Sequence, residues 1–165
     1  MKEEIKQMPK TAIMGFGNPC RSDDGIAMYI IEQLKIFIGD DFPQITLFDM
    51  GTSAFEVLFE LKGHERIIIV DAVINSGEPE GTLFQLPAAA IDAQIQDDPM
   101  VFLHSLKWDQ ALSYAKKILR EEYPNDIQVY LIAVENTKLD IALGDKVKEA
   151  GDKLIEILKK DILGV

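Results

Sequence analysis

The side chains best suited to chemistry are carboxylates that follow apolar runs. Asp24 lies shortly after the apolar run 11–14, Asp49 ends the run that starts at Ile45, and Asp71 directly follows four branched aliphatic residues. A carboxylate in such a place is costly to bury unless it is paired or bound to a metal. Two of these carboxylates together with the imidazole of His104 would form an oxygen and nitrogen site suited to nickel, zinc, manganese or iron.

Other interpretations of the same residues stay open. An aspartate at the start of a helix stabilises that helix through its dipole without doing any chemistry. His104 lies at the start of a predicted helix, where a cationic imidazole is disfavoured, so it is expected to be a neutral ligand or a packed, hydrogen-bonded side chain. A nucleophilic Cys20 beside Arg21 is disfavoured because no histidine is near it in sequence, and His64 is expected in a surface loop. Cys20 also stands where a dinucleotide-binding fingerprint needs its third glycine.

Strands and helices are predicted to alternate along the chain. Ser22, Asp23 and Asp24 are candidate caps for the first helix. Residues 87–100 are predicted to form a loop or a short helix. The predicted strands are 11–14, 45–49, 66–72, 82–86 and 127–134, and the predicted helices are 26–37, 54–61, 101–123 and 145–162.

This alternation predicts an α/β fold, a three-layer sandwich with a mostly parallel sheet of about five strands flanked by helices. In a parallel sheet, the carboxyl ends of the strands lie along one edge. Asp24, Asp49 and Asp71 are therefore expected at that edge, within reach of His104 at the start of a later helix.

Composition limits the class of protein. The 165 residues suit one domain, with residues 1–10 expected to be a flexible N-terminus. A net charge of -11 argues against binding to nucleic acid or to an anionic membrane. The single cysteine excludes an internal disulfide, and no signal peptide or membrane span is recognisable, so a cytoplasmic protein is expected.

Several short motifs, in order, resemble those of the hydrogenase maturation proteases. The resemblance extends from residue 11 to the last predicted helix. Ala27 departs from the family by replacing a glycine often found there, and Cys20-Arg21 lie at variable loop positions. The motifs are Gly15-Phe16-Gly17-Asn18-Pro19, Asp23-Asp24-Gly25, Asp49-Met50-Gly51-Thr52, Ile68-Ile69-Val70-Asp71-Ala72, and His104 before an amphipathic helix.

The resemblance implies an endopeptidase that removes the C-terminal extension of a nickel-iron hydrogenase large-subunit precursor after nickel insertion. It assigns Asp24, Asp71 and His104 as metal ligands and as the catalytic set, with a carboxylate or a metal-polarised water attacking the peptide bond. The nickel is expected to arrive with the precursor, and other divalent cations can occupy the site in crystals. Substrate contacts are expected at Gly17, Asn18, Asp49, Gly51 and Thr52.

Two alternatives from other classes make different predictions. A non-catalytic nickel-sensing or chaperone-like module for hydrogenase assembly would keep the site but leave the precursor uncut. An unrelated α/β hydrolase or nucleotide-binding enzyme would not bring Asp24, Asp71 and His104 together.

Overall fold

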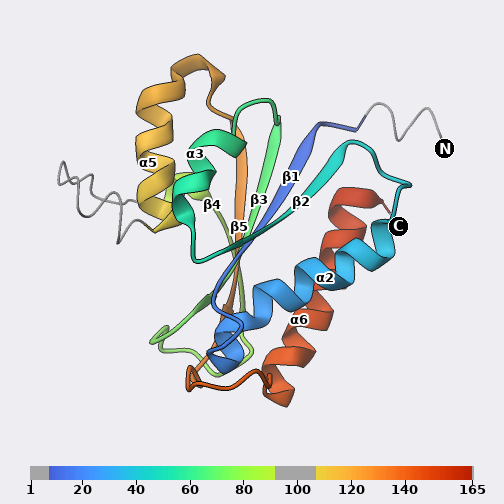
Figure 1. The fold of residues 1–165 in the computed structure, drawn as a ribbon, viewed down its shortest axis with the longest axis vertical. Coiled ribbons are helices and arrows are strands. Elements are labelled where there is room, and N and C mark those ends of the chain that lie inside the picture. Colours follow the sequence, from blue (N-terminus) through green and yellow to red (C-terminus); the bar gives the residue numbers. More distant parts are fainter. Residues whose placement is uncertain (1–7, 92–106, 165) are drawn as a thin grey trace.

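Five strands form one sheet in the order β2-β1-β3-β5-β4 (Figure 1). In this computed structural model, which describes residues 8–91 and 107–164, β1 to β3 and β5 are parallel and the edge strand β4 runs antiparallel to β5. The mostly parallel five-stranded α/β sheet predicted from the sequence is confirmed. The strands are β1 Thr11–Phe16, β2 Ile45–Gly51, β3 Arg66–Val73, β4 Leu83–Pro87 and β5 Asp126–Ala133.

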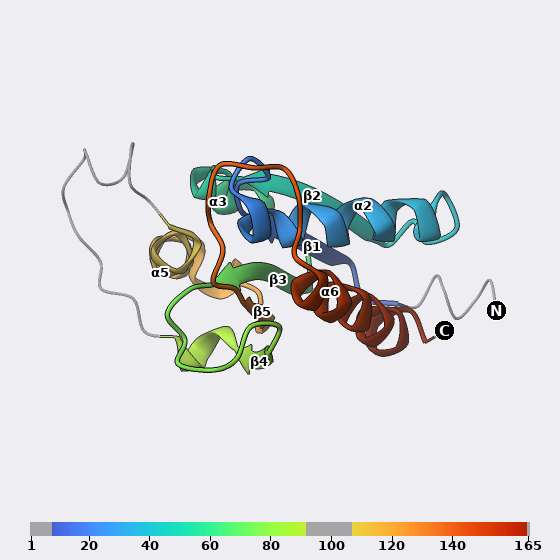
Figure 2. The same cartoon turned by 90° about the horizontal axis from the view of Figure 1, so that it is seen from below.

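Helices cover both faces of the sheet. Helices α2 (Ile26–Ile38) and α6 (Asp145–Leu158) lie on one face, while α3 (Val57–Glu60) and α5 (Trp108–Leu119) lie on the other (Figure 2). No helix in the described part of the chain is long and apolar enough to cross a membrane. The shorter helical turns are η1 Ser22–Gly25, η2 Ala54–Glu56, η3 Ala88–Ala90, η4 Arg120–Glu122 and η5 Lys159–Leu163.

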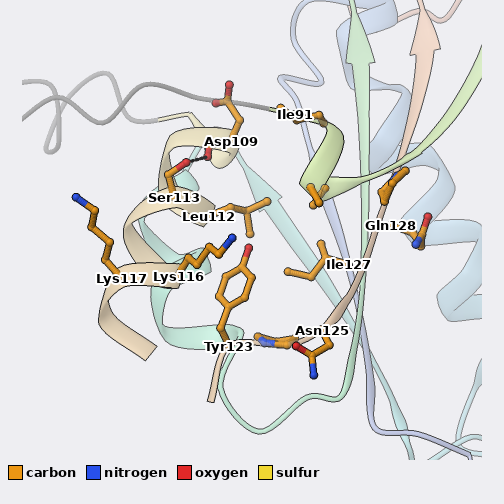
Figure 3. Close-up of a pocket in the computed structure, with 14 residues that line it drawn as sticks. Ile91, Asp109, Leu112, Ser113, Lys116, Lys117, Tyr123, Asn125, Ile127 and Gln128 are labelled. Carbon is orange, nitrogen blue, oxygen red and sulfur yellow. Dashed lines mark hydrogen bonds between the residues drawn. The ribbon is translucent and has the colours of Figure 1, made fainter. Parts of the chain in front are cut away.

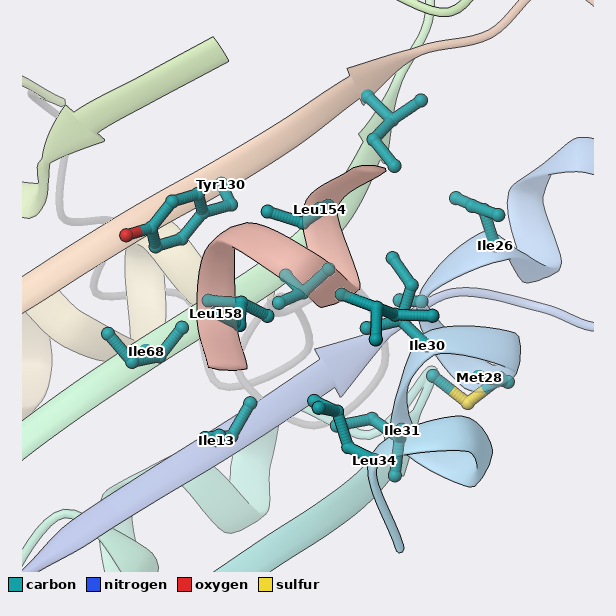
Figure 4. Packing of buried hydrophobic residues seen from close by; sticks show 14 of the residues in the cluster. Ile13, Ile26, Met28, Ile30, Ile31, Leu34, Ile68, Tyr130, Leu154 and Leu158 are labelled. Carbon is teal, nitrogen blue, oxygen red and sulfur yellow. The ribbon is translucent and has the colours of Figure 1, made fainter. Parts of the chain in front are cut away.

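Strand β3 divides its side chains between two hydrophobic cores. Ile68 and Val70 pack with α2 and α6, as Figure 4 shows for Ile68, whereas Ile67 and Ile69 belong to the core beneath α3 and α5. Successive side chains of a strand point to opposite faces, so a run of four buried aliphatic residues requires a layer of helices on each side. This packing fixes the carboxyl end of β3.

The chain reverses its direction of winding at the boundary between β1 and β3. After β1 it moves to β2 on one side, and it then returns to place β3 on the other side. In an open α/β sheet, ligands bind at the carboxyl ends of the strands where the winding reverses. The segment that follows β1 and the end of β3 therefore flank the expected ligand site.

Several predicted boundaries differ from those in the structure. The predicted helix 54–61 is the turn η2 followed by one short α-helix, and the C-terminal helix changes to a π-helical turn after Leu158. The expected capping by Ser22 is wrong, because its hydroxyl donates to the carbonyl oxygen of Lys138 (2.8 Å) and Gly25 precedes α2 without a side-chain cap. Residues 92–106, which include most of the predicted 87–100 loop and the predicted start of the 101–123 helix, lie outside the described residues.

Candidate active site

The turn after β1 holds Asp24 by backbone hydrogen bonds. The Asn18 N–H donates to Oδ2 of Asp24 (3.0 Å), and the Gly17 N–H donates to the carbonyl oxygen of Gly51 (2.8 Å). Gly17 has φ +144°, and a Cβ there would overlap the carbonyl oxygen of Asp24. Glycine is thus required at this position both for its backbone conformation and for the close approach of the turn.

The two neighbouring aspartates of this turn have different surroundings. Asp23 is completely buried, and its Oδ1 accepts the N–H of Gly144, the residue that precedes helix α6 (2.7 Å). Asp24 is only partly buried. Asp23 therefore ties the turn to α6, and Asp24 is the carboxylate available to a ligand.

Asp71 lies inside β3, beyond the point where β1 leaves the sheet. The β1 ladder ends at the pair of Gly15 with Val70, whereas Asp71 still pairs with Leu131 of β5. Its Oδ2 accepts the indole N–H of Trp108 (2.8 Å), and its Oδ1 accepts the N–H of Ala72 (2.7 Å). The carboxylate thus points to the face of the sheet that α5 covers and is held by two donors.

The pKa of Asp71 is raised from 3.8 to about 7. Burial is the main cause, and the negative charge of Asp24 adds to it, while the hydrogen bonds from Trp108 and Ala72 and the charge of Lys107 act in the opposite direction. A carboxyl group with a pKa near neutrality is suited to accept and return a proton at physiological pH.

The pKa of Asp24 is also raised. Burial is the main cause, opposed by the backbone hydrogen bond from Asn18 and by the charge of Arg21. Because its charge also acts on Asp71, the structure brings together two of the three predicted metal ligands.

Asp49, Gly51 and Thr52 lie at the end of β2, next to β1. The side chain of Asp49 is exposed, and its Oδ1 accepts the N–H of Gly51 (3.2 Å). Thr52 is also exposed, and the carbonyl oxygen of Gly51 holds Gly17. This second motif therefore supports the Asp24 turn through its backbone and leaves two polar side chains free for contact at the edge.

His104, the third predicted ligand, lies outside the described residues. Within 8–91 and 107–164, no three His, Cys, Asp or Glu side chains are grouped so that they could hold a metal ion. His64 lies before β3, at the opposite end of that strand from Asp71, with Nδ1 2.8 Å from the carbonyl oxygen of Glu60. The predicted loop position of His64 is therefore confirmed. Cys20, the other residue considered for catalysis, is an exposed free cysteine.

Trp108 is the residue of this site that the sequence analysis did not identify. It begins α5, and its indole ring packs at the border of the core while its N–H reaches Asp71. In the sequence, the helical spacing of Trp108 indicates only a position in the core. No sequence pattern links a tryptophan to a carboxylate 37 residues earlier, so the hydrogen bond to Asp71 could not be predicted.

A separate groove of about 650 Å³ lies between α5 and the strands β4 and β5 (Figure 3). Leu112, Ile127 and Tyr123 line it, and Lys116 extends from α5 toward the hydroxyl of Tyr123. Asp24 and Asp71 do not line this groove, so the carboxylate site is on the rim of the sheet rather than in the large groove.

The fold and the two carboxylates at the edge of the sheet indicate the class of protein. This is an α/β protein with two aspartates of raised pKa at the carboxyl edge of its sheet, where the winding reverses. The model of the hydrogenase maturation protease family matches residues 28–161. The chain therefore belongs to the hydrogenase maturation protease family.

Individual relatives agree with this assignment. The chain is 22% identical to a putative hydrogenase maturation protease of Methanocaldococcus jannaschii, over 94% of this chain and 90% of the relative. It is 24% identical to the hydrogenase 2 maturation protease of Escherichia coli, over 87% of this chain and 85% of the relative. Its fold is similar to that of the hydrogenase maturation protease HycI from Thermococcus kodakarensis (TM-score 0.70, 20% identity, covering 99% and 98% of the two chains).

Proposed function

We propose that this protein is an endopeptidase that removes the C-terminal extension of a nickel-iron hydrogenase large-subunit precursor once nickel has been inserted. The observation that carries the proposal is the presence of two carboxyl groups of raised pKa, Asp24 and Asp71, at the edge of the sheet, with the pKa of Asp71 near 7. The family assignment agrees with a peptidase activity, and the precursor is the substrate that the resemblance implies.

Nickel enters this proposal as part of the substrate. Asp24 and Asp71 supply carboxylate oxygens and His104 an imidazole nitrogen, a ligand set suited to nickel. Asp24 lies in the turn after β1 and Asp71 lies on β3, so both carboxylates would meet an ion that the precursor brings to this edge of the sheet. The ion would thereby dock the extension beside the carboxylates.

The residues of the site also account for the proton transfers. In the ionised form, Asp71 accepts a proton from the water that attacks the scissile carbonyl carbon. When the carbon–nitrogen bond of the tetrahedral intermediate breaks, Asp71 returns the proton to the leaving amine. Trp108 holds the carboxylate in orientation throughout, since its N–H donates to Oδ2.

The test is incubation of the protein with purified precursor, with and without nickel, followed by mass spectrometry of the large subunit. We expect a shortened subunit only from the nickel-loaded precursor, and loss of cleavage with Asp24→Asn, Asp71→Asn or His104→Ala. The matched control is Asp40→Asn, an exposed aspartate in the turn after α2. Binding of the precursor without shortening would instead identify the non-catalytic module, and wild-type rates in the three site variants would refute the ligand assignment.

A further inference from the structure

The loop between β5 and α6 presents two aliphatic side chains to solvent beside the candidate active site. Leu139 is 80% exposed and Ile141 is 83% exposed, the highest values among the large hydrophobic residues of the described chain. Single exposed aliphatic residues are common on protein surfaces. Leu139 and Ile141, however, flank Asp140, whose backbone is hydrogen-bonded to the turn that carries Asp24.

Hydrogen bonds attach residues 136–142, here called the 136–142 loop, to the Asp24 turn. Asp140 forms a parallel bridge with Arg21: its N–H donates to the carbonyl oxygen of Cys20 (3.0 Å), and its carbonyl oxygen accepts the N–H of Ser22 (2.7 Å). The Ser22 hydroxyl donates to the carbonyl oxygen of Lys138 (2.8 Å). Figures 1 and 2 both show the loop alongside the segment that follows β1.

The loop is also braced internally. Oδ1 of Asp140 accepts the N–H groups of Ile141 (2.7 Å) and Ala142 (3.2 Å), and Oδ1 of Asn136 accepts the N–H of Lys138 (3.2 Å). These hydrogen bonds hold the backbone of the loop in a conformation in which Leu139 and Ile141 are exposed. The exposure of the two side chains is therefore built into the loop.

We infer that Leu139 and Ile141 form a docking surface for the body of the precursor protein whose extension is cut. This inference rests on the proposed function. A folded protein that brings a peptide bond to Asp24 and Asp71 must cover the loops at this edge, including the 136–142 loop. Ile74, which follows β3 at the same edge, is also exposed (53%).

The apolar contact acts on affinity rather than on the chemical step. Neither Leu139 nor Ile141 belongs to the carboxylate site, so their loss should weaken binding of the whole precursor and leave the reaction of bound precursor unchanged. Full burial of two aliphatic side chains would correspond to more than about a hundredfold change in affinity, so even partial burial should change it by at least about tenfold.

The test compares the double variant Leu139→Ser/Ile141→Ser with the control Ile36→Ser/Ile118→Ser, whose side chains are 78% and 67% exposed on α2 and α5. We expect the double variant to raise KM for the nickel-loaded precursor at least tenfold with kcat within twofold of wild type, and to raise Kd for the nickel-free precursor equally. The control and the conservative variant Leu139→Met/Ile141→Leu should keep both constants.

The outcomes separate this inference from the proposed function. If the wild-type protein shortens the precursor and the double variant keeps its KM and Kd, the docking surface is refuted and the endopeptidase stands. If the wild type binds the precursor without shortening it and the double variant loses binding, the docking surface stands and the endopeptidase is refuted. Absence of binding by the wild type overturns the docking surface.

Discussion

The indole N–H of Trp108 donates to Oδ2 of Asp71 at 2.8 Å, joining the first residue of α5 to the end of β3. A hydrogen bond to an ionised carboxylate stabilises the ionised form. Trp108 therefore opposes the rise in the pKa of Asp71 that burial causes. It also fixes one oxygen of the carboxylate in space, which makes it a positioning residue for the proposed reaction.

Trp108→Phe removes this donor and keeps an aromatic ring in place. We expect the pKa of Asp71 to rise further, so that the acid limb of the profile of kcat/KM against pH moves upward by roughly one pH unit. The measurement is precursor cleavage across the pH range. Tyr123→Phe, which removes a polar atom from the separate groove, serves as the control; an unmoved acid limb in Trp108→Phe would refute the positioning role.

Asp71 should make stability depend on pH. Its pKa is about 7 in the folded chain against 3.8 as the ordinary value, so the folded state binds the proton more tightly than the unfolded state between these values. The free energy of unfolding should therefore fall as pH rises from 4 to 7 and stay low above pH 7.

Asp71→Asn removes this pH dependence and also loses one of the two acceptor oxygens. Relative to Asp71→Asn, the wild type should lose about 2 kcal/mol of unfolding free energy between pH 5 and pH 8. Urea unfolding of both proteins at the two pH values measures the difference. An equal change in both would mean that the raised pKa does not belong to Asp71.

Gly17→Ala should disrupt the Asp24 turn. The new Cβ would overlap the carbonyl oxygen of Asp24, and φ +144° is unfavourable for alanine. We expect a loss of about 3 kcal/mol or more in the free energy of unfolding, together with loss of cleavage. Gly39→Ala is the control, because Gly39 also has positive φ (+49°) but nothing lies within 4 Å of a Cβ there; it should cost only about 1 kcal/mol and keep activity.

Cys20→Ser distinguishes carboxylate chemistry from thiol chemistry. Cys20 is exposed in the same turn, but the groups of the site whose pKa is raised are the carboxyls of Asp24 and Asp71. The variant should cleave the nickel-loaded precursor at the wild-type rate, measured by the appearance of the shortened subunit. A loss of more than about tenfold would make Cys20 the nucleophile or a nickel ligand.

The sequence by itself determined the fold class and the edge of the sheet that carries the site. Four consecutive aliphatic residues before Asp71 require a strand covered on both faces, and alternating strands and helices require a mostly parallel sheet. Since the carboxyl ends of parallel strands share one edge, Asp24, Asp49 and Asp71 could be assigned to that edge from local patterns alone. The predicted place of His104 in this set stays a prediction.

Only the tertiary structure decides which of two adjacent aspartates is buried and which is accessible to a ligand. Asp23 and Asp24 have the same side chain and the same local signals. Asp23 is nevertheless completely buried and accepts the N–H of Gly144, which precedes α6, whereas Asp24 is only partly buried. Trp108 and the 136–142 loop reach the site across 37 and more than 100 residues of chain. Such contacts depend on how distant elements dock, and periodicity within a short window of sequence does not contain that information.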